Sequence, residues 1–263
     1  MWVNGKQAES LPLDRGLQFG DGHFTTLTIE QGHIRWWASH WRRLQAAARQ
    51  LNSQLPDEKA VVRLLRSIAS TNPNSIIKII VTRGYGARGY GVANPQSCNW
   101  YVTATELAER DSSPLVTDFA EFRLACQPQF AGLKTLNRLE QVMLSQERDR
   151  RGVDELIVLD SRNTVVEAIS SNIFWRSGKQ WYTPWLNQAG IAGIVRERLL
   201  AEKVLGRVQV CASGPGDMRA AEQLFLCNSV LGLRPVAAIG HHRLTVPDLP
   251  EAVQQWWLKS KDF

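Results

Sequence analysis

The sequence has few cysteines, and they lie far apart. Its 263 residues include four, Cys98, Cys126, Cys211 and Cys227, and no two of them form a CxxC pair. Structural zinc sites and disulfide frameworks need cysteines at close or regular spacing. The five histidines do not have metal-ligand spacing either. We therefore expect free thiols, with no metal site and no disulfide scaffold.

The sequence also has no long apolar run. No uncharged stretch approaches the roughly 20 residues that span a bilayer. Residues 1–6 (MWVNGK) lack the basic region followed by an apolar stretch that a secretory signal needs. These absences lead us to expect a cytoplasmic protein that has no membrane partner.

The positive charge is not concentrated in the sequence. The formal net charge is +6, yet acidic residues are interspersed with the basic ones and no run of five basic residues occurs. Nucleic-acid binding usually needs a basic stripe or patch, so we do not expect it. The excess charge favours a small anionic ligand, and a basic, non-catalytic binding protein remains one hypothesis.

The N-terminal half has the pattern of hairpins followed by helices and strands. An Asn-Gly turn at Asn4 predicts one hairpin, and Gln31-Gly32 predicts a second between residues 24–30 and 33–36. Ser39 is the expected cap of the next helix. Further elements follow from apolar spacing and β-branched runs: a helix over 56–69 and strands over 75–82 and 100–105.

The C-terminal half alternates strands with helices. The expected strands are 155–159, 164–168, 172–176, 181–183, 224–227 and 235–239, and the expected helices are 136–150, 193–204 and 250–259. A polar segment with a proline, 109–114, is the candidate linker. With 44% apolar residues, the chain is predicted to form an α+β or α/β protein of two domains, 1–108 and 115–263, with a cleft between them.

Several short segments carry the chemistry. Two of them are GLKTLNRLE at 132–140, which contains Lys134, and EAISSNIF at 167–174, which begins with Glu167. The others are DRGLQFGDGHFTT at 14–26, HWRRL at 40–44, TRGYGARGY at 82–90, GIAGIVR at 190–196 and CNS at 227–229. In this order and spacing, over nearly the whole chain, they resemble the fold-type IV (class IV aminotransferase) pyridoxal phosphate enzymes, and among these the aminodeoxychorismate lyase family.

The resemblance implies a fold and a cofactor site. The fold would be a small N-terminal α/β domain and a larger C-terminal pseudo-barrel domain, with pyridoxal 5'-phosphate in the cleft. Lys134 would form the Schiff base with the cofactor aldehyde. Glu167 would bind the pyridine nitrogen and keep it protonated, so that the ring acts as an electron sink. The phosphate would be held by the residues Arg43, Ile194, Val195 and Ser229.

The phosphate residues are also plausible on physical grounds. Residues 193–195 open an expected helix, and the unpaired backbone N–H groups of Ile194 and Val195 form an anion site without a charged side chain. Arg43 can supply a bidentate charge, and Ser229 a hydroxyl. The alternative for Arg43 is an arginine on a helix surface.

The resemblance further implies a reaction. Aminodeoxychorismate lyases release pyruvate and 4-aminobenzoate for folate synthesis, and Lys134, assisted by Thr26, would move the protons. The substrate is a dianion, and its carboxylates would bind to an arginine of the 82–90 loop and to Asn228. Arg88 is the first choice and Arg83 the alternative, because Arg83 could pair within the strand end.

A fold-type IV transaminase, for D-amino acids or branched-chain amino acids, is the second hypothesis. A D-amino acid transaminase is expected to have a tyrosine at the position of Phe24 and an acidic residue at the position of Thr25. Both differences favour the lyase. Enzymes of this fold pair as homodimers, so the resemblance also implies a homodimer.

Overall fold

The computed structural model describes residues 1–9, 13–86, 89–92 and 97–260, and its contacts divide the chain into two compact units. Of the described residues, unit 1 comprises those within 1–109 and 134–137, and unit 2 comprises 110–133 and 138–260. The chain therefore leaves unit 2 at Lys134 and returns to it at Arg138. The domain limits and linker expected from the sequence stay a prediction, because compactness alone does not show independent folding.

Unit 1 is built on one antiparallel sheet of six strands in the order β2-β1-β6-β5-β3-β4, counted over the described residues. Its elements are β1 Trp2–Val3, β2 Lys6–Gln7, α1 Arg15–Phe19, β3 Gly22–Glu30, β4 His33–Ile34, α2 Trp37–Gln50, α3 Glu58–Thr71, β5 Ser75–Thr82 and β6 Asn99–Glu106. Both predicted hairpins and the strand at 75–82 are confirmed.

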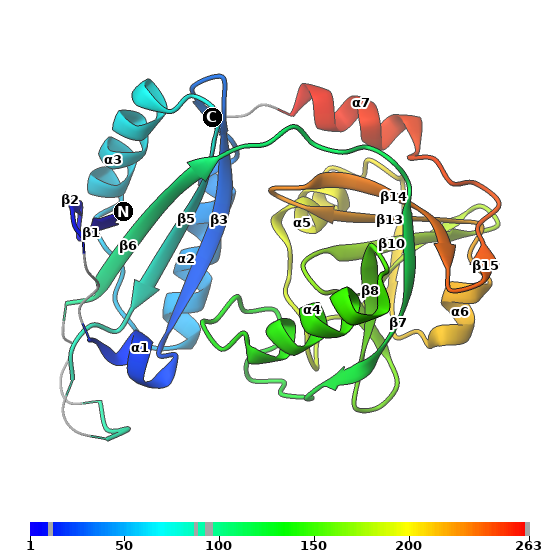
Figure 1. Cartoon of the computed structure of the whole chain (residues 1–263), viewed down its shortest axis with the longest axis horizontal. Helices are drawn as coiled ribbons and strands as arrows, with labels where there is room; N and C mark the ends of the chain where they lie inside the picture. The colour runs from blue at the N-terminus through cyan, green and yellow to red at the C-terminus, as the bar shows by residue number, and fades with distance from the viewer. Residues whose placement is uncertain (10–12, 87–88, 93–96, 261–263) are drawn as a thin grey trace. The chain divides into compact units, whose positions relative to one another are not determined.

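Helices α2 and α3 of unit 1 cover one face of this sheet (Figure 1). Strand residues alternate between the two faces of a sheet. Leu27 and Ile29 of β3 and Ile77 and Ile79 of β5 are fully buried in the core that the two helices share. The intervening residues, Phe24 and Thr26 among them, therefore face the side of the sheet opposite the helices.

The expected cap of α2 is wrong. The N-cap is Trp36, which has a positive φ of 55°, and Ser39 lies inside the first turn of the helix. The Ser39 hydroxyl accepts a hydrogen bond from Arg42 at 3.0 Å instead of capping a backbone amide.

Unit 2 is built on a larger mixed sheet, with nine strands over the described residues in the order β12-β11-β10-β13-β14-β7-β8-β9 and β15 beside β14. Its elements are β7 Leu115–Leu124, α4 Leu139–Arg151, β8 Glu155–Asp160, β9 Val165–Ala168, β10 Asn172–Ser177, β11 Gln180–Pro184, α5 Ile194–Ala201, β12 Val208–Cys211, α6 Pro215–Arg219, β13 Gln223–Asn228, β14 Gly232–Ile239, β15 His242–Arg243 and α7 Glu251–Lys259. The edge strand β9 also contacts β10, so the sheet curls back on itself. The predicted pseudo-barrel is confirmed.

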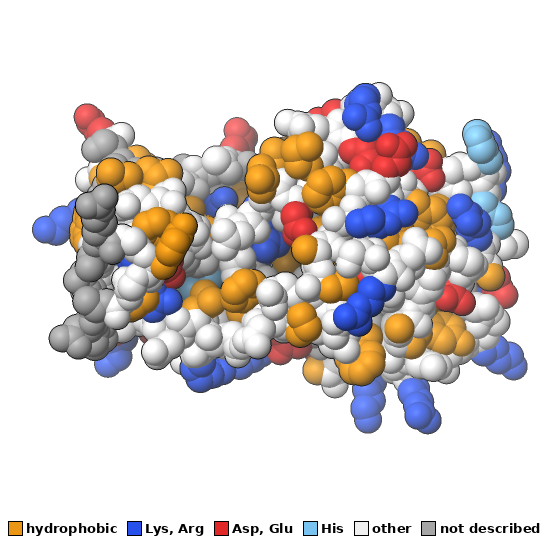
Figure 2. Space-filling view, turned by 90° about the horizontal axis from the view of Figure 1, so that it is seen from below, with side chains coloured by type: hydrophobic (Ala, Val, Ile, Leu, Met, Phe, Trp, Pro, Cys, Tyr) orange, Lys and Arg blue, Asp and Glu red, His pale blue; other side chains and the backbone are white. Residues whose placement is uncertain are grey.

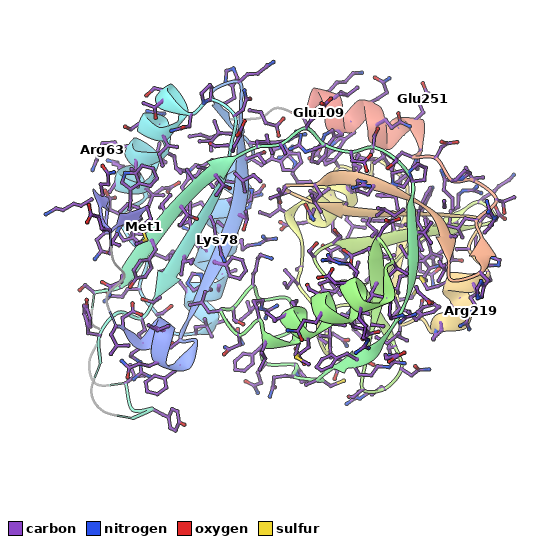
Figure 3. The ribbon with its side chains drawn as sticks, viewed as in Figure 1. Met1, Arg63, Lys78, Glu109, Arg219 and Glu251 are labelled. Atoms are coloured by element: carbon purple, nitrogen blue, oxygen red, sulfur yellow. The ribbon has the colours of Figure 1, made fainter. Side chains whose placement is uncertain are left out.

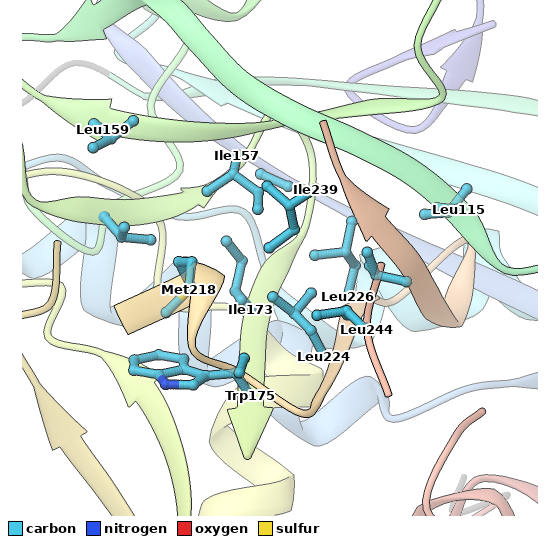
Figure 4. Packing of buried hydrophobic residues seen from close by; sticks show 14 residues of the cluster. Leu115, Ile157, Leu159, Ile173, Trp175, Met218, Leu224, Leu226, Ile239 and Leu244 are labelled. Carbon is cyan, nitrogen blue, oxygen red and sulfur yellow. The ribbon is translucent and has the colours of Figure 1, made fainter. Parts of the chain in front are cut away.

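A close-packed apolar core fills unit 2 (Figure 4). Ile157 of β8, Ile173 and Trp175 of β10 and Leu224 and Leu226 of β13 are all at most 2% exposed. This core fixes the ends of β8, β9, β10 and β13, and those ends carry the candidate site residues of unit 2.

Candidate functional site

Lys134 lies against β3 in an extended segment. The backbone N–H of Phe24 donates to the carbonyl of Lys134 at 2.9 Å, and the N–H of Leu136 donates to the carbonyl of Gly22 at 3.0 Å. His23 and Thr135 form a β-bridge between these two pairs. The expected helix therefore begins at Leu139 and not at 136, because residues 134–136 use their backbone groups to pair with the strand.

Two ammonium groups flank the ring of Phe24. Lys134 Nζ and Lys78 Nζ each lie 4.7 Å from the centroid of that ring, a distance typical of cation–π contacts. Lys78, labelled in Figure 3, is the register partner of Thr26 on β5. Phe24, Thr26 and Lys78 therefore share the sheet face opposite α2 and α3 with the Lys134 ammonium.

Lys78 is a candidate site residue that the sequence motifs did not indicate. Its signal is a single charged residue inside the apolar run at 76–80, IIKII. A lysine there is exposed on the face opposite the helices, whereas its neighbours Ile77 and Ile79 are fully buried. The pattern alone also fits an ordinary solvent-facing strand residue, so the role became visible only with its position beside Phe24.

Arg43 lies on α2 in unit 1, half-buried. One helical turn before it, His40 is fully buried, and its Nδ1 lies 2.6 Å from the Thr25 hydroxyl oxygen. Burial lowers the pKa of His40 well below its usual value, and the charge of Arg43 lowers it further. The Thr25–His40 hydrogen bond therefore joins α2 to β3 next to Thr26 without adding a charge.

The carboxylate of Glu167 is buried near the end of β9 in unit 2. Its side chain is 4% exposed, and Oε2 accepts a hydrogen bond from the backbone N–H of Ile191 at 2.8 Å. Burial lowers the pKa of Arg138. The negative charges of Glu167 and Glu140 act in the opposite direction and partly offset this effect. Glu167 and Arg138 therefore interact electrostatically within unit 2.

The loop before α5 brings the expected phosphate amides to the Glu167 side of unit 2. Gly193 is the N-cap of α5, no side chain caps the helix, and Ile194 and Val195 are its first two residues. Gly132 donates its N–H to the carbonyl of Gly190 at 2.9 Å. Gly132 in turn accepts a hydrogen bond from the backbone N–H of Ala192 at 3.1 Å, so the two segments are paired on both sides of the bridge between Gly132 and Ile191.

Asn228 ends β13 with its side chain already engaged within unit 2. Its Nδ2 donates to the Ser170 carbonyl at 3.2 Å and to the Ser171 hydroxyl at 3.0 Å, and its Oδ1 accepts the N–H groups of Val230 and Leu231. Ser229, the expected phosphate ligand, follows directly. In this geometry Asn228 shapes the turn that presents Ser229.

Arg83 makes an extensive set of hydrogen bonds in unit 1. Its Nε donates to the Asp21 carboxylate at 2.9 and 3.1 Å, and its two Nη atoms donate to the carbonyls of Leu51 and Asn52 at 2.7 Å each. These contacts tie Arg83 to the strand end, which favours Arg88 as the substrate ligand. Arg88 itself lies outside the described residues.

Other classes of site receive no support from the described part of the chain. No group of three or more His, Cys, Asp or Glu residues there could hold a metal ion. None of the described helices combines the length and the apolar character needed to cross a membrane. In Figure 2, Lys and Arg side chains are scattered over the visible face and do not form one patch.

The two sheets with their helices, the larger sheet curled back on itself, are those of the fold-type IV enzymes. The model of the amino-transferase class IV family matches residues 22–239, and the chain belongs to this family. Members of this family use pyridoxal phosphate.

Individual relatives are similar to the chain over most of its length. Aminodeoxychorismate lyase of Vibrio harveyi is 34% identical over 246 residues, which is 90% of each chain. The crystal structure of 4-amino-4-deoxychorismate lyase from Pseudomonas aeruginosa is 33% identical, with a TM-score of 0.88 and 99% of each chain covered. A putative branched-chain-amino-acid aminotransferase of Methanocaldococcus jannaschii is 26% identical, covering 100% of this chain and 93% of the relative.

Proposed function

We propose that this protein is a pyridoxal phosphate-dependent lyase that converts 4-amino-4-deoxychorismate to 4-aminobenzoate and pyruvate. The observation that carries the proposal is the pair of ammonium groups, Lys134 and Lys78, each 4.7 Å from the centre of the Phe24 ring. One can act as the base and the other can bind a carboxylate. The similarity to two lyases at 33–34% identity supports the same reaction.

The residues of unit 2 fit the cofactor. A Cβ atom at Gly190 would lie 3.3 Å from Glu167 Oε2 and 2.5 Å from Val166, and Gly190 has a φ of 84°, so the loop comes close to the carboxylate only with glycine there. The uncapped amides of Ile194 and Val195 and the Ser229 hydroxyl are suitable donors for a phosphate. A buried carboxylate is a suitable partner for a protonated pyridine nitrogen.

When bound, pyridoxal phosphate supplies an electron sink for the electrons of a breaking bond. The residues of the chain would bind the cofactor and transfer the protons. Lys134 would hold the aldehyde end and then remove the proton from the ring carbon that bears the substrate amine. Glu167 would keep the pyridine nitrogen protonated. Ile194, Val195, Ser229 and Arg43 would bind the phosphate.

The remaining residues would bind the substrate and move the second proton. Lys78 would bind one carboxylate of the dianion, and Arg88 or, as the alternative, Arg83 the other, with Asn228 at the turn beside Ser229. Loss of the enolpyruvyl group makes the ring aromatic, and Lys134 or Thr26 would deliver a proton to the departing methylene carbon. The homodimer implied by the resemblance stays a prediction.

The second candidate, a transaminase, is tested by adding amino donors. We expect D-alanine and L-isoleucine to leave the spectrum of the cofactor-loaded protein unchanged over minutes, whereas aminodeoxychorismate alone yields 4-aminobenzoate. Conversion of the cofactor to its amine form by either amino acid, with release of the keto acid, would support the transaminase. The Phe24→Tyr variant serves as a comparison, since it supplies the expected D-amino acid transaminase residue.

A further inference from the structure

Asn172 makes a contact that the proposed mechanism does not use. It is the first residue of β10, its side chain is buried, and its Nδ2 donates to the carbonyl of Ile191 at 2.8 Å. The N–H of the same Ile191 donates to Glu167 Oε2 at 2.8 Å. Both backbone polar groups of Ile191 are therefore held by side chains, one by the carboxylate and one by the amide.

The other end of the Asn172 amide lies against the start of α5. A Cβ atom built on Gly193 would come within 1.9 Å of Asn172 Oδ1. Gly193 has an ordinary φ of −72°, so glycine is needed there for close approach and not for backbone conformation. Asn172 therefore contacts both the carbonyl at 191 and the N-cap of the helix whose first amides belong to Ile194 and Val195.

The backbone of Asn172 is held firmly. Asn172 pairs with Cys227 in the antiparallel ladder of β10 and β13, and two residues further along, the rings of Phe174 and Phe225 stack with centroids 5.2 Å apart. Cys227 is itself only 1% exposed, so this part of the ladder is buried. The amide of Asn172 therefore projects from a rigid strand end into a loop that has little regular structure of its own.

We propose that Asn172 is a positioning residue that fixes the phosphate-binding amides of α5 relative to Glu167. The proposal rests on the proposed cofactor site. The phosphate and the ring nitrogen of the cofactor are a fixed distance apart. The amides that bind the phosphate and the carboxylate that binds the nitrogen must therefore also be held at a fixed distance from each other. The chain of contacts from Glu167 through Ile191 and Asn172 to Gly193 sets that spacing within unit 2.

Phosphate selectivity measures this role directly. Apoprotein is titrated with pyridoxal 5'-phosphate and with pyridoxal, which lacks the phosphate, and the ratio of the two dissociation constants is taken. Asn172→Asp keeps the shape and Oδ1 but loses the donor, and Asn172→Ala loses the whole amide. Because either change leaves the buried Ile191 carbonyl without its donor, we expect the selectivity ratio to fall by about tenfold or more in both variants.

Thr117→Val is the matched control. The Thr117 hydroxyl, fully buried in unit 2, donates to the carbonyl of Ala238 at 2.9 Å, so this change also removes one buried donor from a backbone carbonyl. We expect it to lower the melting temperature but to leave the selectivity ratio within about twofold of the original protein. Circular dichroism shows whether each variant is folded.

The outcomes separate the two proposals. An unchanged ratio in the Asn172 variants, an equal fall in Thr117→Val, or Asn172 variants that fail to fold while Thr117→Val folds would each overturn the positioning role. An unmodified protein that binds pyridoxal as tightly as pyridoxal 5'-phosphate, or binds neither, would instead overturn the proposed cofactor site and the positioning role with it. Failure of the lyase reaction alone leaves the selectivity test intact.

Discussion

Replacing Asp21 by asparagine should destabilise unit 1 substantially. Asp21 Oδ2 accepts hydrogen bonds from Arg15 Nε at 2.8 Å and from Arg83 Nε at 2.9 Å. Arg15 in turn donates to the backbone carbonyls of Gly89, Tyr90 and Gly91 at 3.0–3.3 Å. The single carboxylate therefore neutralises two guanidinium groups, and one of these, that of Arg15, also binds the backbone of residues 89–91.

The size of the effect follows from burial. The side chains of Arg15, Asp21 and Arg83 are 6%, 16% and 15% exposed, so the ion pairs are close to the buried limit. Removing one partner of a buried pair costs about 3–5 kcal/mol. Taking the lower end, about 3 kcal/mol, and about 2–4 °C per kcal/mol for a chain of this size, the melting temperature should fall by about 6–12 °C.

Thermal melting followed by circular dichroism tests this value. The control is Asp149→Asn, because Asp149 pairs with Arg148 at 2.6 Å but the two side chains are 67% and 33% exposed. A surface pair contributes about 0–1 kcal/mol, so the control should melt within about 4 °C of the original protein. If Asp21→Asn melted no lower than Asp149→Asn, the argument from burial would be wrong.

The same variant has a predicted pH dependence. Burial acts to raise the pKa of Asp21, but the hydrogen bonds and charges of Arg83 and Arg15 lower it below its usual value. A carboxyl whose pKa is lowered on folding stabilises the protein above its unfolded pKa and loses that contribution as the pH falls through the folded pKa. The difference in the free energy of unfolding between the original protein and Asp21→Asn should therefore be largest near pH 7 and should decrease below about pH 4.

Two further variants test the residues proposed to bind the substrate and the cofactor. Lys78→Gln should raise the KM for the anionic substrate by about 10- to 100-fold, because a charge-assisted contact is lost. The control is Lys6→Gln, since Lys6 is also an exposed strand lysine of unit 1, and this variant should have an unchanged KM in steady-state assays. Gly190→Ala should weaken pyridoxal phosphate binding by about tenfold or more, because its Cβ would meet Val166 at 2.5 Å. Gly178→Ala, at a φ of 57° with open space around it, should bind the cofactor normally; equal losses at both glycines would contradict the steric argument.

Local pattern predicted most of the sheets but missed β7, Leu115–Leu124. Its apolar run is interrupted by Asp118, Glu121 and Arg123, and the sequence pattern indicated no element there. The charges are balanced by a helix distant in sequence: Asp118 pairs with Arg151 of α4, and Glu147 of the same helix accepts the N–H groups of Glu121 and Phe122. No periodicity within the strand could have shown these partners.

The start of α4 was placed too early for a related reason. Apolar spacing extends the helical pattern back to Leu136, but the backbone groups of Lys134 and Leu136 pair with β3. That pairing, between residues more than a hundred positions apart, places the lysine beside Phe24. The site residues named from motifs stay predictions, whereas the roles proposed for Lys78 and Asn172 needed the strand register and the contacts of Ile191.

Turnover of aminodeoxychorismate without any keto acid tests the central claim most directly. We predict that the protein loaded with pyridoxal phosphate performs many turnovers and releases pyruvate and 4-aminobenzoate in a ratio of about 1:1, as the elimination requires. Lys134→Arg should abolish this activity, and Lys203→Arg, at an exposed position of unit 2, should retain it. Absence of both products from the loaded protein, or a requirement for a keto acid as amino acceptor, would contradict the account.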